Sequence, residues 1–423
     1  MDFIKNIVKS QLFRLSSLNT LSILVRVAGG LIGSKMIALF IGPAGMAVTG
    51  NLRSMMTSLD AFCTLGMQNG IIKYTAENDK NTDKLNKVLA TTFVTILSAL
   101  GIIMLILFIP AGYWSTKVFG SIDYVWAVRA LAITLPLYSG NLVFMAVLNG
   151  LGNFKRVIYL NIWGNIAGVA STSVLIWQLG LTGAVIGLIA YPSILFFFSV
   201  YHIYRLFPGF TFVNKRYFDK SILKGLLSYS VMMLLSAVLG SVVYIGIRNF
   251  ISEQHTEDAA GFYEAVNRIA GFYLMFASTM LTVYFLPKLS SAVSNEDTKG
   301  VIRSYYKIMV PVFAGGLTLV YVLRMVIIKV LFAKDFLPME NLFLWQLMGD
   351  FFKVCSLILG FEFFAKKMTK AYIVSEVLSF TILYTSSHLL IPQYGAEGAV
   401  MAHAITYACY FLVLVVYFRK KII

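Results

Sequence analysis

The sequence predicts an all-α membrane protein with twelve transmembrane helices in two six-helix lobes related as parallel repeats. Of the 423 residues, 58% are hydrophobic and only 13% are charged, whereas a soluble protein carries about 25% charged residues. A helix needs about 20 apolar residues to cross the hydrocarbon core of a bilayer, so this chain with short loops can form about twelve spans. The composition therefore excludes an assembly of soluble domains.

Twelve apolar stretches, separated by polar or Gly/Pro-containing breaks, are the expected spans. They cover residues 11–40, 44–73, 87–110, 122–149, 157–179, 181–204, 222–251, 258–287, 300–328, 338–365, 369–391 and 395–418. We expect an N-terminal lobe at 1–204, a basic cytoplasmic linker at 205–221 and a C-terminal lobe at 222–423. The first stretch lacks a small-residue cleavage site, so it is expected to remain as a helix rather than to be removed as a signal.

The two halves repeat each other at a constant offset of 215 residues. Arg53 corresponds in this way to Arg268, and Lys73 corresponds to Lys288. The segment GLTGAV at 180–185 likewise matches GAEGAV at 395–400. Because six is an even number of spans, both halves insert in the same orientation, as in transporters built from parallel repeats.

The basic residues predict the orientation in the membrane. Most of the 35 Lys and Arg residues fall in segments on the side of the N-terminus. The segments assigned to the opposite side hold only Lys117, Arg248, Lys329 and Lys334. Cytoplasmic loops carry the excess of Lys and Arg, so both termini are expected in the cytoplasm. The net charge of +16 is thus mostly a topology signal and does not indicate a nucleic-acid partner.

Two matching arginines lie deep in the predicted spans, where an ionisable side chain is energetically costly and usually functional. Arg53 lies about 14 Å into the second span at about 1.5 Å per residue, and Arg268 lies at the matching depth of the eighth. We expect them to face each other across the lobe interface and to bind phosphate or pyrophosphate with their guanidinium donors. The alternative is a structural ion pair, with Asp60 for Arg53 or with Glu264, four residues earlier, for Arg268.

Further charges within the spans leave similar alternatives open. Arg26 shares a helix stripe with glycines at 29, 30 and 33, which indicates either a gating helix or close packing with a buried ion pair. Asp350 and Lys353 form either an internal salt bridge or a site in which Lys353 binds phosphate or sugar. Arg129 lies within reach of the outer surface. The expected substrate-binding residues are Arg26, Arg53, Arg268, Lys353 and Arg129, and the expected ion-coupling residues are Asp60, Glu264 and Asp350.

Enzyme chemistry is not indicated. The chain has no Gly-x-x-x-x-Gly-Lys-Ser/Thr loop for nucleotide phosphates, and its short loops leave no room for a soluble catalytic domain. Its three cysteines lie in apolar runs without paired spacing. His388 and His403 are isolated in the sequence and lack metal-ligand spacing. We expect no enzyme activity, no cofactor and no metal.

Three motifs resemble those of the Wzx-type flippases: FIGPAG at 40–45 followed by Asn51-Leu52-Arg53, YFLPKLS at 284–290, and WQLMGDFFKV at 345–354. The resemblance covers nearly the whole chain. That family translocates lipid-linked oligosaccharides for O-antigen, enterobacterial common antigen and related glycans. It belongs to the multidrug/oligosaccharidyl-lipid/polysaccharide superfamily, whose members have two six-helix lobes.

The resemblance implies a polyprenyl-pyrophosphate-linked oligosaccharide as substrate, moved from the cytoplasmic to the periplasmic leaflet of the bacterial inner membrane by alternating access. Membrane lipids and a glycan polymerase or ligase complex are the other expected partners. A multidrug or cation exporter of the same superfamily is disfavoured, because bases outnumber acids within the predicted spans. A flippase for the peptidoglycan lipid precursor is only weakly separated by the motifs.

Overall fold

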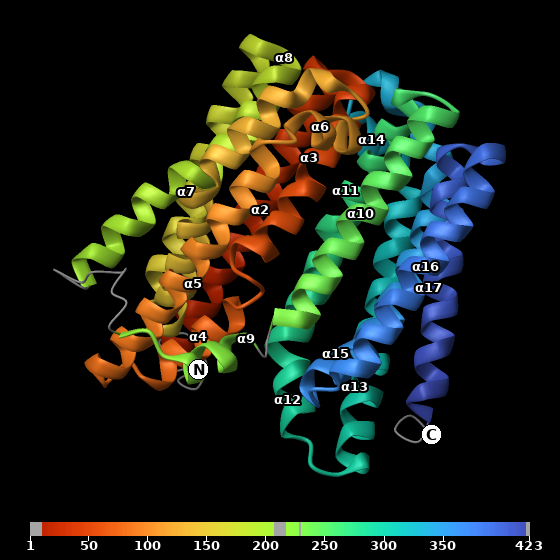
Figure 1. The fold of residues 1–423 in the computed structure, drawn as a ribbon. Helices are drawn as coiled ribbons and strands as arrows, with labels where there is room; N and C mark the ends of the chain where they lie inside the picture. The colour runs from red at the N-terminus through yellow and green to blue at the C-terminus, as the bar shows by residue number, and fades with distance from the viewer. Residues whose placement is uncertain (1–10, 207–216, 228–229, 420–423) are drawn as a thin grey trace, which may run out of the picture. The chain divides into compact units, whose positions relative to one another are not determined.

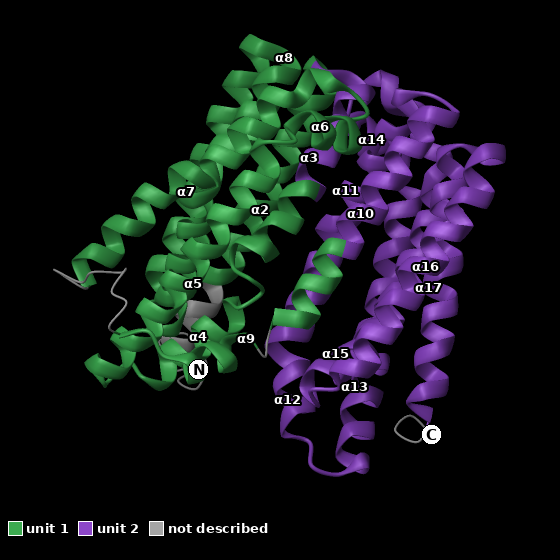
Figure 2. Cartoon of the chain, in the orientation of Figure 1, with its two compact units in different colours: residues 1–40, 55–238 green, residues 41–54, 239–423 purple. Residues whose placement is uncertain are grey.

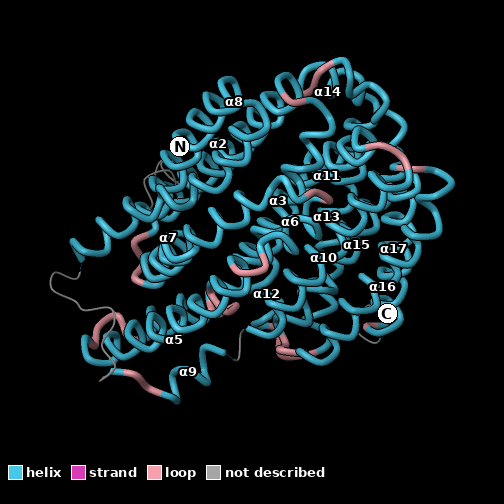
Figure 3. The backbone as a smooth tube through the Cα atoms, turned by 45° about the horizontal axis from the view of Figure 1, so that its top comes forward, coloured by secondary structure: helices cyan, strands magenta, loops and turns pink. Residues whose placement is uncertain are grey.

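The computed structural model describes residues 11–206, 217–227 and 230–419. The middle of the predicted linker, 207–216, lies outside the described residues. Within the described residues the backbone consists of helices and their connections, without a strand (Figure 3). The predicted all-α class is therefore confirmed.

The chain forms two compact units, which Figure 2 colours separately. Unit 1 contains Met1–Phe40 and Met55–Val238, and unit 2 contains Ile41–Ser54 and Leu239–Ile423. Two helices, α3 (Gly42–Cys63) and α10 (Ser230–Gln254), contribute residues to both units. Unit 2 therefore includes the first part of α3, with the Asn51-Leu52-Arg53 motif.

Unit 1 is built around two long helices, α7 and α8, which pack against each other. Helix α2 also packs on α8, and α4 and α5 pack on α7. Apolar residues of α7 such as Leu131 and Leu135 are fully buried in these contacts. Apart from α3 and α10, its elements are α2 (Gln11–Phe40), α4 (Gln68–Glu77), α5 (Thr82–Phe108), α6 (Ala111–Phe119), η1 (Ile122–Tyr124), α7 (Val125–Gly150), α8 (Phe154–Leu206) and α9 (Lys220–Leu227) (Figure 1).

Unit 2 is built around α15, which packs against α11, α13 and α17, while α16 packs on α17. The Tyr305 hydroxyl of α13 donates a hydrogen bond of 2.7 Å to the Val354 carbonyl of α15. The elements that lie wholly in this unit are α11 (Glu257–Met280), the π-helical turn η3 (Leu281–Phe285), α12 (Leu286–Ser291), α13 (Asn295–Val322), α14 (Arg324–Leu331), η4 (Lys334–Leu342), α15 (Phe343–Ala365), α16 (Thr369–Tyr394) and α17 (Ala396–Tyr417).

The repeated glycine motif forms the same corner in each unit. Gly180 divides α8 into two arms with φ 57° and ψ −129°, and Gly395 separates α16 from α17 with φ 59° and ψ −135°. A positive φ of this kind suits glycine because it has no Cβ. A Cβ at Gly183 would lie 1.9 Å from the carbonyl oxygen of residue 175, and one at Gly398 would lie 2.4 Å from that of residue 390. Residues 215 positions apart in the two glycine motifs therefore have nearly the same backbone conformation.

The predicted second span, 44–73, is wrong as one continuous helix. Helix α3 ends at Cys63, and α4 begins at Gln68 after a turn with positive φ at Leu65 and Gly66. A Cβ at Gly66 would lie only 2.7 Å from the Ser230 carbonyl oxygen. The close approach of α10 therefore favours glycine and a break at this point.

Ten helices in the described part of the chain are long and apolar enough to cross a membrane. This set treats the two arms of α8 as one helix and does not include α3. Large apolar side chains are exposed on these helices, among them Ile102 (63%), Trp163 (66%) and Leu389 (73%). Such exposure is expected where lipid rather than water is the solvent, so the chain is a multi-pass membrane protein.

Candidate functional site

Glu264 of α11 holds two buried arginines of unit 2. Its carboxylate accepts a 2.8 Å contact from Arg248 Nη1 and a 3.0 Å contact from Arg268 Nε. The exposed fractions of the three residues are only 6%, 3% and 7% in the order Glu264, Arg248 and Arg268. The ion pair between Arg268 and Glu264, one helical turn earlier, is therefore present, whereas a role of Arg268 in substrate binding stays a prediction.

Arg248 corrects the topological assignment made from the sequence. The sequence places it among the basic residues of the outer segments, but it is buried within α10 and paired with Glu264. Its Nε donates to Asn51 Oδ1 at 2.6 Å, and its Nη2 donates to the Gly50 carbonyl oxygen at 3.2 Å. Ser54 Oγ also accepts a hydrogen bond from Nη2. The Asn51-Leu52-Arg53 segment therefore orients a buried cation that the sequence did not reveal.

Helix α3 can approach this cluster because it carries a glycine there. A Cβ at Gly50 would lie 2.4 Å from Glu264 Cδ. The residue before Gly50, Thr49, accepts a 2.8 Å hydrogen bond from Arg268 Nη2 through its Oγ1. The start of α3 thus binds both arginines that Glu264 pairs, and it fixes the directions of their donors.

Positive charge exceeds negative charge in this arginine cluster, which consists of Arg53, Arg248, Arg268 and Glu264. Arg53 is half-buried in the same unit, where Arg268 and Glu264 are its main electrostatic neighbours. Glu264 thus pairs with two guanidinium groups and is an electrostatic neighbour of a third. Arg268 Nη1 is buried and makes no hydrogen bond to any described residue. Excess charge with an available guanidinium donor suits an oxyanion such as a phosphate.

A second polar cluster centres on Asp350 of α15, which is fully buried. One carboxylate oxygen lies 3.0 Å from His403 Nε2 of α17. The other accepts a 3.0 Å hydrogen bond from Gln346 Nε2 and a hydrogen bond from the Tyr273 hydroxyl of α11. A Cβ at Gly349 would lie 2.3 Å from His403 Cδ2, so this glycine permits the close approach of the imidazole.

The Asp350–Lys353 salt bridge, one of the two alternatives for this pair, is not formed. Asp350 pairs with His403, and Lys353 Nζ lies 4.7 Å from the ring centroid of Tyr407. Both new partners come from α17, which packs along α15. Tertiary packing therefore replaces the local helical pair, and Lys353 is held by a cation–π contact.

A cavity of about 250 Å³ in unit 2 is lined by Arg248 of the arginine cluster and by Asp350, Gln346 and His403 of the second cluster. It is smaller than typical sites for drug-sized ligands, which occupy about 300–1,000 Å³, so it matches a small charged group better than an oligosaccharide. Arg248 and Lys353 contribute cations to its wall, and Asp350 with His403 contributes a pair of groups that can share a proton. The lining residues are Ser54, Tyr244, Arg248, Asn267, Ala270, Gly271, Leu274, Gln346, Asp350, Lys353 and His403.

The remaining predicted residues lie in unit 1. Arg26 is exposed on α2, and Tyr191 is among its electrostatic neighbours. Arg129 is exposed near the start of α7, with its guanidinium 5.6 Å from the ring centroid of Phe108. Asp60 is half-buried on α3, and its Oδ1 makes no hydrogen bond to a described residue. None of the three lines the unit 2 cavity.

Metal binding finds no support in the described residues, where no three His, Cys, Asp or Glu side chains gather into a possible ligand set. The site residues that the sequence did not reveal are Arg248, Asn51, Tyr273, Gln346 and His403. Arg248, Asn51, Tyr273 and His403 have partners far away in the sequence, so no local spacing marks them. Gln346 lies one helical turn before its partner Asp350.

Comparison of the sequence with known proteins identifies related proteins. A model of the polysaccharide biosynthesis protein family matches residues 15–293. The lipid III flippase of Escherichia coli K12 is 31% identical over 393 residues, which are 92% of this chain and 94% of that protein.

Two groups of solved structures share the fold. An inward-facing multidrug resistance MATE family transporter of the MOP superfamily aligns with a TM-score of 0.79 at 15% identity, over 95% of this chain and 94% of its own. The lipid II flippase MurJ in an inward closed conformation aligns with a TM-score of 0.73 at 16% identity, over 96% and 87%. The family model and the lipid III flippase cover most of the sequence, and the chain therefore belongs to the polysaccharide biosynthesis protein family.

Proposed function

We propose that the chain is a flippase that translocates a polyprenyl-pyrophosphate-linked oligosaccharide from the cytoplasmic to the periplasmic leaflet of a bacterial inner membrane. The observation that carries the proposal is the arginine cluster, in which Glu264 pairs with both Arg248 and Arg268 and the buried Arg268 Nη1 makes no hydrogen bond to a described residue. A cation exporter needs the opposite balance of charge. The 31% identity to a lipid III flippase supports the same class of substrate.

The diphosphate is the part of the substrate that the cluster can bind. Arg268 offers a buried Nη1 donor, and Arg53 adds a second guanidinium beside it. The polyprenyl chain stays in the bilayer, where its transfer into a polar cavity would be unfavourable. The oligosaccharide extends beyond the 250 Å³ cavity, which has room only for a small group.

Transport follows alternating access between two six-helix lobes, as in other transporters built from repeats. In this arrangement the chain has twelve spans, because the two arms of α8 count as two spans rather than one and α3 is added to the ten candidates. Both termini then lie in the cytoplasm. Arg26, Arg129 and Lys353 are proposed to meet the anionic substrate along its route. A membrane potential contributes about 2.3 kcal/mol per charge per 100 mV to outward movement of an anionic headgroup.

Asp350 and His403 form the best-supported coupling pair, because a carboxylate 3.0 Å from an imidazole can hold a proton between them. Asp350 lines the same cavity as Arg248, so its protonation state acts on the charge that the substrate meets. Glu264 has a mainly structural part in this proposal, since it pairs with two arginines. Asp60 is proposed as a second ionisable group, in unit 1.

Complementation tests the proposal. A strain lacking its lipid-linked oligosaccharide flippase, supplied with the cognate glycan pathway, should regain surface glycan when it expresses this chain. Arg53→Ala and Arg268→Ala should each reduce export at least about tenfold, since a hydrogen bond to a charged group contributes about 1.5–3 kcal/mol. Arg303→Ala, which removes an exposed arginine of α13, is the matched control. Full export by both cluster variants at normal membrane levels would exclude the diphosphate site.

A flippase for the peptidoglycan lipid precursor remains the second candidate, because its substrate also carries a polyprenyl diphosphate. Complementation of strains that lack one or the other flippase distinguishes these two candidate functions. Rescue of a strain depleted of its lipid II flippase, without rescue of the oligosaccharide-export strain, would favour the second candidate. Rescue of dye or drug resistance alone would favour the exporter.

A further inference from the structure

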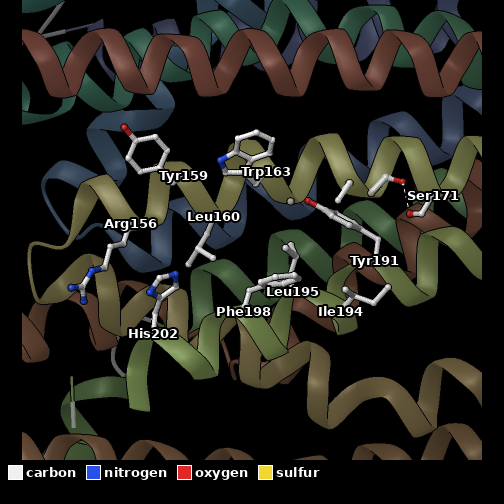
Figure 4. Close-up of a pocket in the computed structure, with 13 residues that line it drawn as sticks. Arg156, Tyr159, Leu160, Trp163, Ser171, Tyr191, Ile194, Leu195, Phe198 and His202 are labelled. Atoms are coloured by element: carbon white, nitrogen blue, oxygen red, sulfur yellow. Dashed lines mark hydrogen bonds between the residues drawn. The ribbon is translucent and has the colours of Figure 1, made fainter. Parts of the chain in front are cut away.

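A long apolar groove lies between the two arms of α8 in unit 1, away from the residues used above. Its volume is about 500 Å³. Figure 4 shows Arg156 and His202 together at one end of the groove and Ser171 and Tyr191 at the other. The lining residues are Arg156, Tyr159, Leu160, Trp163, Gly164, Ala167, Gly168, Ser171, Tyr191, Ile194, Leu195, Phe198 and His202.

Glycines of the first arm form the floor of the groove. A Cβ at Gly164 would lie 2.6 Å from Leu195 Cδ2, and a Cβ at Gly168 would lie 2.3 Å from Tyr191 Cδ2. The two arms therefore approach closely along this line. Above it the side chains are open to the surroundings, as the exposed fractions of Trp163 (66%) and Phe198 (56%) show. The result is an open channel with apolar walls, suited to a hydrocarbon chain.

The charged residue among the described lining residues is Arg156, at one end of the groove. Arg156 and Arg205 are the charged neighbours that act on His202 there, and Arg205 also lies 4.9 Å from the ring centroid of Tyr201. At the other end, Arg26 of α2 is an electrostatic neighbour of Tyr191. None of the described lining residues is acidic. Arg156 lies near the first residue of α8 and Arg205 near its last. Basic pockets at the ends of transmembrane helices bind anionic lipid headgroups.

The groove is long enough to hold an acyl chain through the whole depth of one leaflet. The lining runs from Arg156 to Ser171, which is about 22 Å at about 1.5 Å per residue. Half of a bilayer core is about 15 Å thick. An acyl chain whose phosphate lies at Arg156 can therefore remain in the groove over its whole length.

We propose that this groove, formed by the two arms of α8, is a binding site for one anionic phospholipid of the bilayer. The phosphate binds Arg156 and His202, and one acyl chain lies over Gly164 and Gly168 beside Trp163. Both walls belong to consecutive arms of a single helix that meet at Gly180, and the length fits a leaflet-deep chain. These features favour a resident phospholipid over the much longer polyprenyl chain of a transported substrate. The site is independent of the arginine cluster and goes beyond the proposed function.

Trp163 makes the proposal measurable, because bromine atoms on a neighbouring acyl chain quench indole fluorescence. One sensor retains Trp163 alone, with Trp114, Trp126, Trp177 and Trp345 replaced by Phe. The matched sensor retains Trp177 alone, which is 67% exposed on the same arm but does not line the groove. Each full-length sensor is reconstituted in vesicles of phosphatidylcholine that contain increasing fractions of brominated phosphatidylglycerol or brominated phosphatidylcholine.

Trp163 should be quenched at a lower fraction of brominated phosphatidylglycerol than of brominated phosphatidylcholine, and Trp177 should respond equally to both. Arg156→Gln should reduce the preference for phosphatidylglycerol over phosphatidylcholine, as reported by Trp163, about fivefold. Lys155→Gln, at an exposed residue outside the groove, should preserve this preference. Ala167→Phe, which fills the exposed floor of the groove, should abolish it. Ala170→Phe, at an exposed alanine outside the lining, should preserve it.

Equal quenching of Trp163 by the two lipids would overturn the proposal. Displacement of phosphatidylglycerol by a polyprenyl phosphate at equal mole fraction would also overturn it, since the groove would then hold the substrate's tail. Native mass spectrometry of the chain with all its tryptophans provides a second measurement, free of the Phe replacements. It should show a retained phosphatidylglycerol that Arg156→Gln loses and Lys155→Gln keeps, and equal retention by both variants would contradict the site.

Discussion

Glu264→Gln tests whether the negative charge of Glu264 is needed for the stability of the folded protein. Glu264 is 6% exposed and makes ion pairs of 2.8 and 3.0 Å with Arg248 and Arg268. Glutamine keeps the shape and removes the charge that pairs with Arg248 and Arg268. Removing one partner of a buried ion pair costs about 3–5 kcal/mol, because the remaining charge stays buried and uncompensated. We expect a loss of that size in the free energy of unfolding.

The assay is thermal unfolding of the purified protein in detergent, where this loss should lower the Tm by roughly 3–6 °C, since the unfolding entropy is about 2.1 cal/mol/K per residue. Glu253→Gln removes an exposed carboxylate of α10 and should change stability by no more than about 0.5 kcal/mol. Inorganic pyrophosphate should raise the Tm of Glu264→Gln, because an anion that binds the folded state stabilises it. The reasoning is refuted if Glu264→Gln unfolds at the same temperature as Glu253→Gln.

Three further outcomes follow from the structure. Gly349→Ala should destabilise the protein by about 1–3 kcal/mol, because its Cβ would lie 2.3 Å from His403. Gly360→Ala on the same helix should not destabilise it, because the nearest atom to that Cβ lies at 3.9 Å. Thermal unfolding of the two variants measures the difference. His403→Gln should make transport in proteoliposomes independent of an imposed pH gradient, whereas His388→Gln, at a half-buried residue outside the unit 2 cavity, should leave the dependence intact. A cysteine added at either terminus should react with an impermeant maleimide only from the cytoplasmic side, and labelling from outside would reverse the topology.

Those parts of the fold that depend on local pattern could be predicted from the sequence. Apolar runs gave the helices, and the shared spacing of Gly180 and Gly395 anticipated two corners with the same backbone conformation. The four-residue spacing of Glu264 and Arg268 likewise indicated that the two side chains could form an ion pair, which the structure contains. These features lie within one or two helical turns, so the sequence order determines which atoms meet.

The rest of the site depends on contacts between distant helices. Arg248 resembles an interfacial arginine near the end of an apolar run, and only the packing of α10 beside α11 and the start of α3 makes it a buried partner. His403 has no polar neighbour of suitable spacing, because Asp350 reaches it from another helix. The same tertiary contact removes the salt bridge that a three-residue spacing suggested for Asp350 and Lys353. Glycines that permit close approach, such as Gly349, are visible only once the neighbouring helix is placed.

Translocation by the purified protein tests the central claim most directly. The chain is reconstituted in proteoliposomes whose inner leaflet is loaded with a fluorescent polyprenyl-pyrophosphate-linked oligosaccharide, and an external glycosidase reports arrival of the sugar outside. The account predicts transport by the unaltered chain and by Arg303→Ala, at least about tenfold slower transport by Arg268→Ala, and competition by inorganic pyrophosphate. Equal rates for Arg268→Ala and the unaltered chain would contradict the claim that the arginine cluster binds the diphosphate.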